Sequence, residues 1–285
     1  MISFAKRNLK VYFRDKSSVF FSLLAVLIVL GLYVLFLGDQ LVGSVKDKVD
    51  GAQRLMDSWI MAGILAVIPV STTLGSFGAI VNDKSKKIIK DFRCSPIRPS
   101  ALAGGYILSS FLIGTIMSVF GLALIEIYFA IKGYALLTGL QLLQLLGTIL
   151  LSVLTSSALM YLVVSLFSSQ NAFATASTII GTLIGFITGI YLPIGSTDQS
   201  IQYVIELFPI SHAASLFRKI LMADPLADSF KNVPDQFLTE FKLDMGVEFK
   251  AFDHTFTSLE SILYLLGAAV LFYVIGILIT KKKSR

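Results

Sequence analysis

The chain has 285 residues, of which 55% are hydrophobic and 15% charged, and its formal net charge is +6. Soluble domains commonly devote about a quarter of their residues to charge, so this composition is typical of a membrane protein and excludes an ordinary pair of soluble domains. Cys94 is the only cysteine, which excludes an intrachain disulfide, and the sequence has no Cys/His motif for a metal site.

Six apolar stretches predict membrane-spanning helices, because a helix needs roughly 20 residues to cross about 30 Å of hydrocarbon. The first stretch follows basic residues, as a secretory signal would, but its apolar core is longer and no small-residue cleavage site follows, so we expect a retained anchor. We therefore expect an all-α integral membrane protein with a single transmembrane domain, 1–285, and spans at about 19–37, 58–81, 101–131, 141–167, 173–192 and 261–280.

Basic residues alternate from one side of these spans to the other. Five Lys or Arg precede the first span, six lie in 82–100 and four follow the sixth span, whereas 193–260 carries ten Asp or Glu against five Lys or Arg. Because Lys and Arg gather in cytoplasmic connections, we expect both termini in the cytoplasm and 193–260 outside. Anionic lipid headgroups then explain the basic side without a nucleic-acid partner.

Residues 2–16 precede the first span and combine apolar and basic positions at helical spacing. The apolar set is Ile2, Ala5, Leu9, Tyr12 and Phe13. This pattern predicts a basic amphipathic helix that lies in the membrane interface with its apolar side toward the acyl chains. The alternative interpretation is a simple topology signal, but five apolar positions at the helical period favour the surface helix.

The second span contains Pro69, followed by the hydroxyl residues Thr72, Thr73 and Ser76. Proline removes a backbone hydrogen bond and bends a helix, and nearby hydroxyls can satisfy the carbonyls that it leaves free. The same residues could instead form a polar, bendable face that lines a pathway. The sequence favours neither interpretation over the other.

The connection 82–100 predicts a short two-faced helix between the second and third spans. We expect Asp83 to cap a helix that begins near Lys84 and Pro96 to prevent its continuation. The apolar face holds Ile88, Ile89 and Phe92, and the basic residues are Lys86, Lys87, Lys90 and Arg93. If the segment were only a solvated basic turn, its apolar face would be exposed to water without a partner. We therefore expect the apolar face to insert into a groove of a protein partner.

Two features stand out in the third and fifth spans. Glu126, the only acidic residue that we place inside a span, is a candidate proton or cation site, although it lies near the outer end and could reach the interface by snorkelling. Small residues recur at four-residue spacing in the fifth span, which predicts a tight helix contact either within the chain or with a second copy. They are Ser177, Gly181, Gly185 and Gly189.

The external connection begins with "IQYVIELFPISHAASLFRKILM" at 201–222, which is amphipathic but too short to span and is interrupted by Pro209. It predicts two short re-entrant helices in the outer leaflet, with His212, Arg218 and Lys219 toward water. Residues 224–258 are charged and rich in turns, and we expect a small external subdomain there.

Taken together, these features resemble the type 2 ABC exporter permeases, the six-span membrane subunits of ATP-driven bacterial exporters. The resemblance is carried by the leader at 2–16, by "DKSKKIIKDFRCSPIRPSALAGGYIL", by "LFPISHAASLFRKILM" and by the order of the six spans. It covers nearly the whole chain except about 224–258, which looks like an insertion. The sequence "NDKSKKI" keeps the family's acidic residue, Asp83, but lacks the glycine that often accompanies it.

The resemblance implies roles for several residues. Residues 84–94 would be the coupling helix that binds an ABC ATPase, through Lys87, Ile88, Ile89, Lys90, Phe92 and Arg93. Two permease chains would pair, as a homodimer, and the second and fifth spans would line the path, which places Pro69, Thr72, Thr73, Ser76, Thr178 and Thr182 along it. The helices at 201–222 would close its outer end.

The resemblance also implies a function. The sequence has no G-x-x-x-x-G-K-[ST] phosphate loop, so ATP and Mg²⁺ would be bound by the separate ATPase, and we expect this chain to bind no cofactor and to be a transport subunit rather than an enzyme. The expected cargo is a drug, antibiotic or peptide that leaves through the bacterial cytoplasmic membrane. A lipid or lipid-linked glycan is the alternative cargo, and a proton-coupled secondary transporter using Glu126 is the alternative mechanism.

Overall fold

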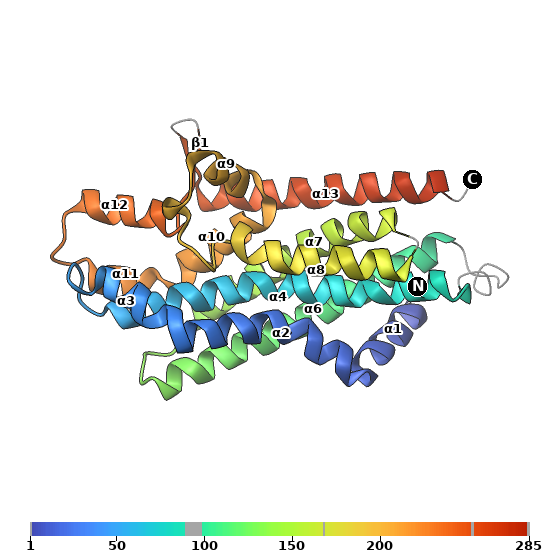
Figure 1. Cartoon of the computed structure of the whole chain (residues 1–285), viewed down its shortest axis with the longest axis horizontal. Helices are drawn as coiled ribbons and strands as arrows, with labels where there is room; N and C mark the ends of the chain where they lie inside the picture. Colours follow the sequence, from blue (N-terminus) through green and yellow to red (C-terminus); the bar gives the residue numbers. More distant parts are fainter. Residues whose placement is uncertain (1, 89–98, 168, 252–253, 284–285) are drawn as a thin grey trace.

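A computed structural model describes residues 2–88, 99–167, 169–251 and 254–283. These residues form an elongated bundle whose long helices run along one axis (Figure 1). Six of the helices are long and apolar enough to cross a membrane, which confirms the expected all-α fold of a multi-pass membrane protein. The strands found among the described residues are β1 (Lys250–Ala251) and β2 (His254–Thr255), which pair as a small antiparallel hairpin.

The first span is longer than the sequence predicts. It consists of α2 (Lys16–Leu32), a π-helical turn at Tyr33–Leu37 and α3 (Gly38–Lys46). Asp15 caps its start, because the carboxylate accepts hydrogen bonds from the backbone N–H groups of Ser17 and Ser18. A π-helical turn is wider than an α-helical one and has no distinct sequence pattern, so the sequence gives no indication of it.

The other five spans lie close to the predicted positions, except that α4 begins six residues earlier than the predicted residue 58 and α8 ends earlier than predicted. They are α4 (Ala52–Ser85), α6 (Pro99–Ile131), α7 (Gly139–Leu166), α8 (Gln170–Ile187) and α13 (Ser258–Lys283). Helix α8 was expected to continue to residue 192 but ends at Ile187, since Gly189 adopts a φ of 64° that ends a helix and suits glycine.

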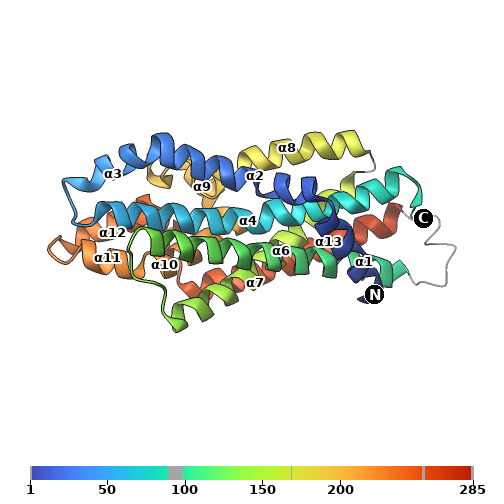
Figure 2. The ribbon, with the colours of Figure 1, turned by 90° about the horizontal axis from the view of Figure 1, so that it is seen from below.

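Helix α4 is the centre of the bundle. Of its most apolar window, 78% is buried, against 12% for the first span and 17% each for α8 and α13. Figure 2 shows α2 and α8 in a row along one side of α4 and α6 on its other side, and α4 also contacts α7. Because lipid tails are as apolar as these side chains, close packing rather than escape from water holds the spans together.

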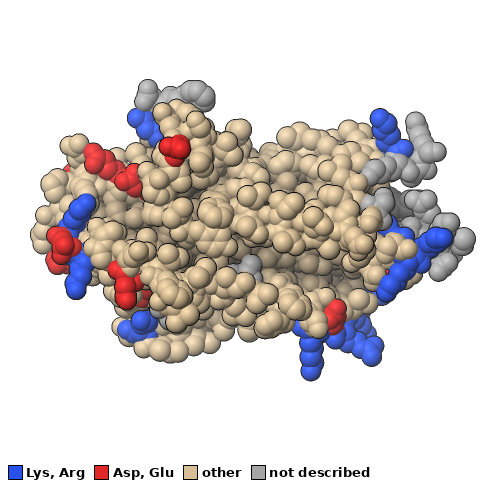
Figure 3. Space-filling view, in the orientation of Figure 1, with Lys and Arg blue, Asp and Glu red and all other residues tan. Residues whose placement is uncertain are grey.

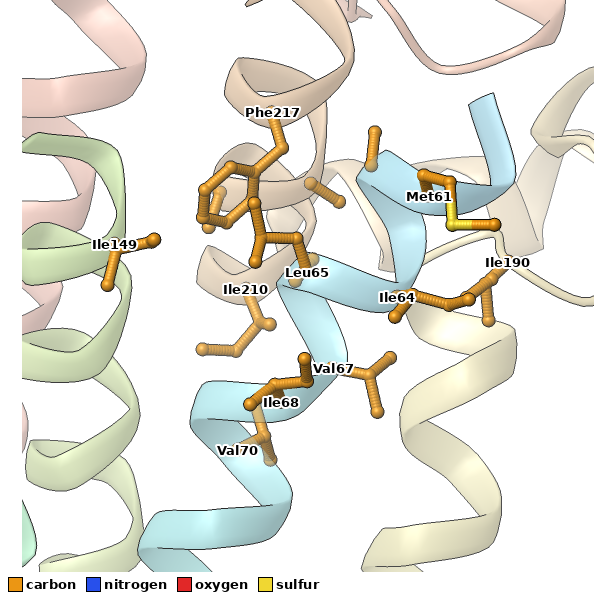
Figure 4. Close-up of a cluster of buried hydrophobic side chains, with 14 of the residues drawn as sticks. Met61, Ile64, Leu65, Val67, Ile68, Val70, Ile149, Ile190, Ile210 and Phe217 are labelled. Carbon is orange, nitrogen blue, oxygen red and sulfur yellow. The ribbon is translucent and has the colours of Figure 1, made fainter. Parts of the chain in front are cut away.

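Close packing is visible where α4 meets its neighbours. Leu65 of α4 lies beside Phe217, and Ile149 of α7 approaches the same cluster (Figure 4). Gly114 of α6 makes room nearby, because a Cβ there would lie 2.8 Å from Cγ1 of Val153. An alanine at position 114 would therefore push α6 away from α7.

Short helices follow α8. They are a 3-10 turn at Ile194–Ser196, α9 (Gln199–Leu207), α10 (Pro209–Leu221), α11 (Ala223–Ser229) and α12 (Asp235–Asp244). The predicted break at Pro209 is confirmed, because this residue occupies the first turn of α10, where its missing N–H is not needed. Helix α10 does not lie on the surface but contacts α4, α7 and α13.

Charge separates the two ends of the bundle (Figure 3). Lys and Arg gather at the end that carries α1 (Ile2–Arg14), the end of α4 and the end of α13, while most Asp and Glu visible in this view lie at the other end. We call these the basic end and the acidic end. The visible surface between them is almost free of charge, as a membrane-spanning belt requires.

Candidate functional site

The α4 hydroxyls that the sequence singles out lie in the protein interior. Thr72 and Thr73 are fully buried and donate to the backbone oxygens of Ile68 and Pro69, each at 2.7 Å. Ser76 donates to the Thr73 carbonyl at 2.8 Å, and its oxygen lies 2.7 Å from that of Ser110 in α6. These bonds satisfy the hydroxyls around Pro69, and the α-helix continues through the proline.

The surface of α4 between α2 and α8 has small residues instead. Gly75 is exposed, and Ser71 and Gly78 are half-buried. A Cβ added at Gly75 would lie 3.5 Å from Ser22 of α2, and one at Gly78 would lie 3.5 Å from Phe173 of α8. The two flanking helices therefore approach α4 closely there and leave a narrow small-residue strip, which includes Ser71, Gly75 and Gly78.

Helix α8 buries one side and exposes threonines on the other. Phe173 and Ile184 are buried toward the bundle, while Thr178 and Thr182 are exposed and lie on the side turned away from them by the helical period. Both threonine hydroxyls donate to the backbone oxygen four residues earlier, Thr178 at 3.2 Å and Thr182 at 3.0 Å. The hydroxyls on the exposed side of α8 are thus satisfied within the helix and stand beside exposed apolar residues such as Leu183, which suits a surface within a membrane.

The small residues of the fifth span do not all lie on one helix. Ser177 is half-buried and Gly181 has no described atom within 4 Å of an added Cβ. Gly185 packs against the ring of Tyr191, and Gly189 lies beyond the end of α8 beside Ile194. Gly181 therefore leaves space for another helix. The space beside Gly185 and Gly189 is instead filled by Tyr191 and Ile194 of the same chain.

At the basic end, Asp83 belongs to α4 and not to the start of a new helix, so the predicted cap is wrong. The Asp83 carboxylate accepts from both Arg7 nitrogens, at 2.9 and 3.3 Å, and from the Tyr106 hydroxyl at 2.6 Å. The hydrogen bond from Arg7 to Asp83 raises the pKa of Arg7 above its usual value. These three residues form a clasp that joins α1, α4 and α6.

The apolar residues of α1 are divided between the protein interior and the surface, so the expected orientation of this helix toward acyl chains stays a prediction. Phe4, Ala5 and Tyr12 are buried, and the Phe4 and Tyr106 rings meet edge to face with centroids 4.8 Å apart. Ile2 remains exposed, as the amphipathic prediction requires of at least part of the helix. This ring contact packs α1 against α6.

Most of the predicted partner-binding helix lies outside the described residues. This applies to Ile89, Lys90, Phe92 and Arg93, and to the predicted stop at Pro96. Lys87 is exposed and has a φ of 61°, so the chain turns sharply directly after α4. Ile88 is half-buried. The Asp83 clasp therefore sits immediately before this segment.

At the acidic end, the longer α4 includes Asp57, which the sequence pattern does not single out. Its carboxylate is fully buried and accepts from the Tyr33 hydroxyl at 2.6 Å, the Tyr134 hydroxyl at 2.7 Å and the Gln53 amide at 3.0 Å. Tyr33 begins the π-helical turn, and Tyr134 lies in the connection between α6 and α7. Asp57 thus joins three parts of the chain.

Glu126 has a simpler environment. It is half-buried, and its carboxylate accepts from the backbone N–H of Leu137 at 3.3 Å. That contact places it at the acidic end, in agreement with the interpretation of Glu126 as a helix-end residue that reaches the interface.

The expectation that His212 and Arg218 face water is wrong, because both are fully buried in α10. The two ring nitrogens of His212 lie 2.8 Å from the Glu206 carbonyl oxygen and 3.3 Å from the Ser261 hydroxyl. Burial lowers the pKa of His212 to about 4, so the ring is neutral near pH 7.

Lys219 is half-buried and donates to the Phe256 carbonyl at 3.1 Å. Lys219 and His212 thus contact Phe256 and Ser261, which lie 37 and 49 residues further along the chain, and sequence patterns do not reveal such contacts.

Among the described residues, no group of three or more His, Cys, Asp or Glu side chains gathers in a way that could hold a metal ion. A family model described as ABC-2 family transporter protein matches residues 46–278. The match includes the whole of α4, α6, α7, α8 and α10 and most of α13. A comparison with curated proteins gave no match.

Proposed function

The protein belongs to the ABC-2 family of transporter proteins, in which it is a multi-pass membrane permease subunit, and on that premise we propose that it is the exporter permease of a bacterial cytoplasmic membrane, driven by a separate ABC ATPase. The observation that carries this proposal is the single, uninterrupted helix α4. It runs from the Asp57 contacts at the acidic end to the Asp83 clasp at the basic end. Because the helix is continuous, a displacement of its basic end would be transmitted to its acidic end.

In this proposal the basic end faces the cytoplasm. Support comes from the charge distribution, since Lys and Arg accumulate in cytoplasmic connections and they dominate the end with α1 and the end of α13 (Figure 3). The ATPase would then meet the permease at the basic end and the cargo would leave at the acidic end.

The ATPase would bind the segment 84–94 through Lys87, Ile88, Ile89, Lys90, Phe92 and Arg93. Support comes from the apolar and basic pattern of these residues and from the clasp beside them. Because Asp83 bonds to Arg7 and to Tyr106, movement of this segment would reach α1, α4 and α6 together. ATP and Mg²⁺ would act through the ATPase only.

Two copies of the chain would pair across the exposed side of α8. Helix α8 is mostly unburied within one chain, and Gly181 leaves space on it for another helix. We place Thr178 and Thr182 along the path. Pro69, Thr72, Thr73 and Ser76 would reach the path in a state where α4 turns away from α6, since these residues are buried in the structure and the Ser76 hydroxyl bonds to Ser110 of α6.

The cargo would be an amphipathic or hydrophobic drug, antibiotic or peptide. The exposed side of α8 offers threonine hydroxyls and apolar side chains without a charge, so it would attract neither a strongly acidic nor a strongly basic molecule. A lipid or lipid-linked glycan is the alternative cargo within the same family.

Co-purification with an ABC ATPase from the same organism tests the coupling assignment. The double variant Ile89→Asp/Phe92→Asp should lose the ATPase while its yield in the membrane stays that of the natural chain, because two carboxylates cannot enter an apolar groove. Lys231→Asp at the acidic end is the matched control and should retain the ATPase. Equal recovery of the ATPase and equal ATP-dependent transport by the double variant would contradict the assignment.

A further inference from the structure

Arg218 is a buried cation without an acidic partner. Its side chain is fully buried in α10, and no carboxylate among the described residues lies within ion-pair distance. Its Nε has no hydrogen-bond partner there either. A buried charge strongly destabilises a fold unless other groups compensate it, so something else must hold the guanidinium.

The compensation comes from the carboxyl ends of two helices. Nη2 of Arg218 donates to the carbonyls of Thr188 at 2.9 Å and Gly189 at 3.0 Å, which follow α8. Nη1 lies 3.4 Å from the carbonyl of Gly246, which follows α12. The ends of helices carry partial negative charge on such carbonyls, so two of them together can replace a carboxylate.

The backbone at both sites is shaped for this contact. Gly189 has a φ of 64° and Gly246 a φ of 63°, in the left-handed region that ends helices and favours glycine. A Cβ at Gly246 would lie 2.9 Å from Nη1 of Arg218. Glycine is therefore required there both by the backbone and by the approach of the guanidinium.

Neighbouring side chains extend the contact. Ser215 lies one turn and Ser211 two turns before Arg218, on the same side of α10. The Ser211 hydroxyl donates to the Ile187 carbonyl at 2.8 Å, and the Ser215 hydroxyl donates to the Val247 carbonyl at 2.6 Å. One side of α10 thus bonds to the end of α8 and to the turn after α12.

Helix α4 is part of the same arrangement through Trp59. The Arg218 guanidinium lies 5.1 Å from the centre of the Trp59 ring, and Trp59 Nε1 donates to the Met245 carbonyl at 2.8 Å. A cation over an aromatic face is attracted to it, more strongly when water is absent. Arg218 therefore contacts α4, the turn after α8 and the turn after α12 at once.

We propose that Arg218 is a positioning residue that makes α10, the end of α8 and the turn after α12 move as one body during transport. The inference rests on the proposed function, in which α8 lines the path, and on the expectation from the family resemblance that the helices at 201–222 close the outer end of that path. A planar guanidinium can donate to two helix ends from one side chain, whereas the single ammonium of lysine cannot span both. Charge alone would therefore not replace Arg218.

Amide hydrogen exchange on the purified full chain tests this directly. In Arg218→Met, the amides of Thr188, Gly189 and Gly246 should exchange about tenfold faster or more, because the turns that they stabilise lose their partner. Arg218→Lys should keep protection at no more than one of the two helix ends, which also covers the case where Arg218→Met does not fold. Lys219→Met removes a neighbouring positive charge whose hydrogen bond is to the Phe256 carbonyl rather than to either helix end, so it should leave these amides unchanged. Unchanged exchange at both ends in Arg218→Lys would overturn the proposal.

A second readout separates positioning from stability. With its ATPase in vesicles, Arg218→Lys should hydrolyse ATP within about twofold of the natural rate but export at least about tenfold less cargo per ATP, because the outer closure no longer follows α8. Equal cargo per ATP in the two proteins would overturn the role in transport. If the natural complex neither hydrolyses ATP nor exports cargo, the proposed function fails, while the exchange result still decides whether Arg218 joins the segments.

Discussion

Asp57 shows what a single buried carboxylate does at the end of a span. It accepts three hydrogen bonds from side chains, two of them from tyrosines that are distant in the sequence. Hydrogen bonds to a charged acceptor contribute more than neutral ones, and loss of the acceptor would leave buried donors without a partner. Asp57 therefore fixes the π-helical turn and the connection between α6 and α7 to α4.

Asp57→Asn should lower the thermal stability of the purified chain, with a loss of about 1–3 kcal/mol in the free energy of unfolding, because one amide group cannot accept all three bonds. Tyr33→Phe should lose part of the same energy, and the double variant should lose less than the sum of the two. Asp50→Asn, at an exposed position of the same end, is the control. Equal midpoints for Asp57→Asn and the natural chain would show that the network is unimportant for stability.

His212 predicts a dependence of stability on pH. Its pKa in the fold is about 4, below its usual value near 6.5, so the unfolded chain binds the proton more readily. The stability that it contributes is fully present above about pH 6.5 and is lost as the pH falls toward 4. Thermal unfolding at pH 7 and pH 5 should show a smaller decrease for His212→Gln than for the natural chain.

The second histidine provides a control for that measurement. His254 is exposed and pairs with Glu260 at 2.9 Å, so His254→Gln should retain the decrease of the natural chain. Identical decreases in all three proteins would exclude His212 as the source.

The burial and the hydrogen-bond partners of individual polar residues were the features hardest to predict from the sequence. Asp57 was placed just outside a span, and His212 and Arg218 were placed in water, since charged residues in a short amphipathic segment usually lie there. Their partners are carbonyls and hydroxyls far away in the chain, such as those of Thr188 and Ser261. Only the folded arrangement brings these groups together.

At the scale of elements, the spans could be predicted because their length follows from the thickness of the bilayer. The end of α8 could not, since a glycine within an apolar run does not reveal whether its φ is positive. The interior position of α10 was also missed. Its apolar residues, such as Ile210 and Phe217, pack against α4 rather than against lipid (Figure 4).

Pairing of two copies across α8 is the element-scale prediction. In a chain whose Cys94 is replaced by serine, Thr178→Cys should form a disulfide-linked dimer in membranes treated with a mild oxidant, because the exposed side of α8 would face its counterpart. Leu271→Cys, on an exposed part of α13, should stay monomeric. Cross-linking at Leu271 and not at Thr178 would place the contact between the two copies on α13 and contradict pairing across α8.

At the scale of the whole molecule, charge asymmetry was evident from the sequence and the folded chain displays it as two ends (Figure 3). A membrane-impermeant thiol reagent tests the orientation that we propose. Lys231→Cys in the Cys94→Ser chain should be labelled on intact cells, since α11 and α12 lie at the acidic end beside it. Labelling only after the cells are opened would reverse the orientation.

The central claim is that an ATPase at the basic end moves the path-lining helices through 84–94. Spin labels at position 182 of both copies, in a Cys94→Ser chain reconstituted with its ATPase, measure this movement directly. ATP with vanadate should change the distance between the labels, and the variant Ile89→Asp/Phe92→Asp should abolish that change while the distance without ATP stays the same. The claim would be contradicted if the distance between the labels did not change with ATP and vanadate in an active complex, or if it changed equally in the variant.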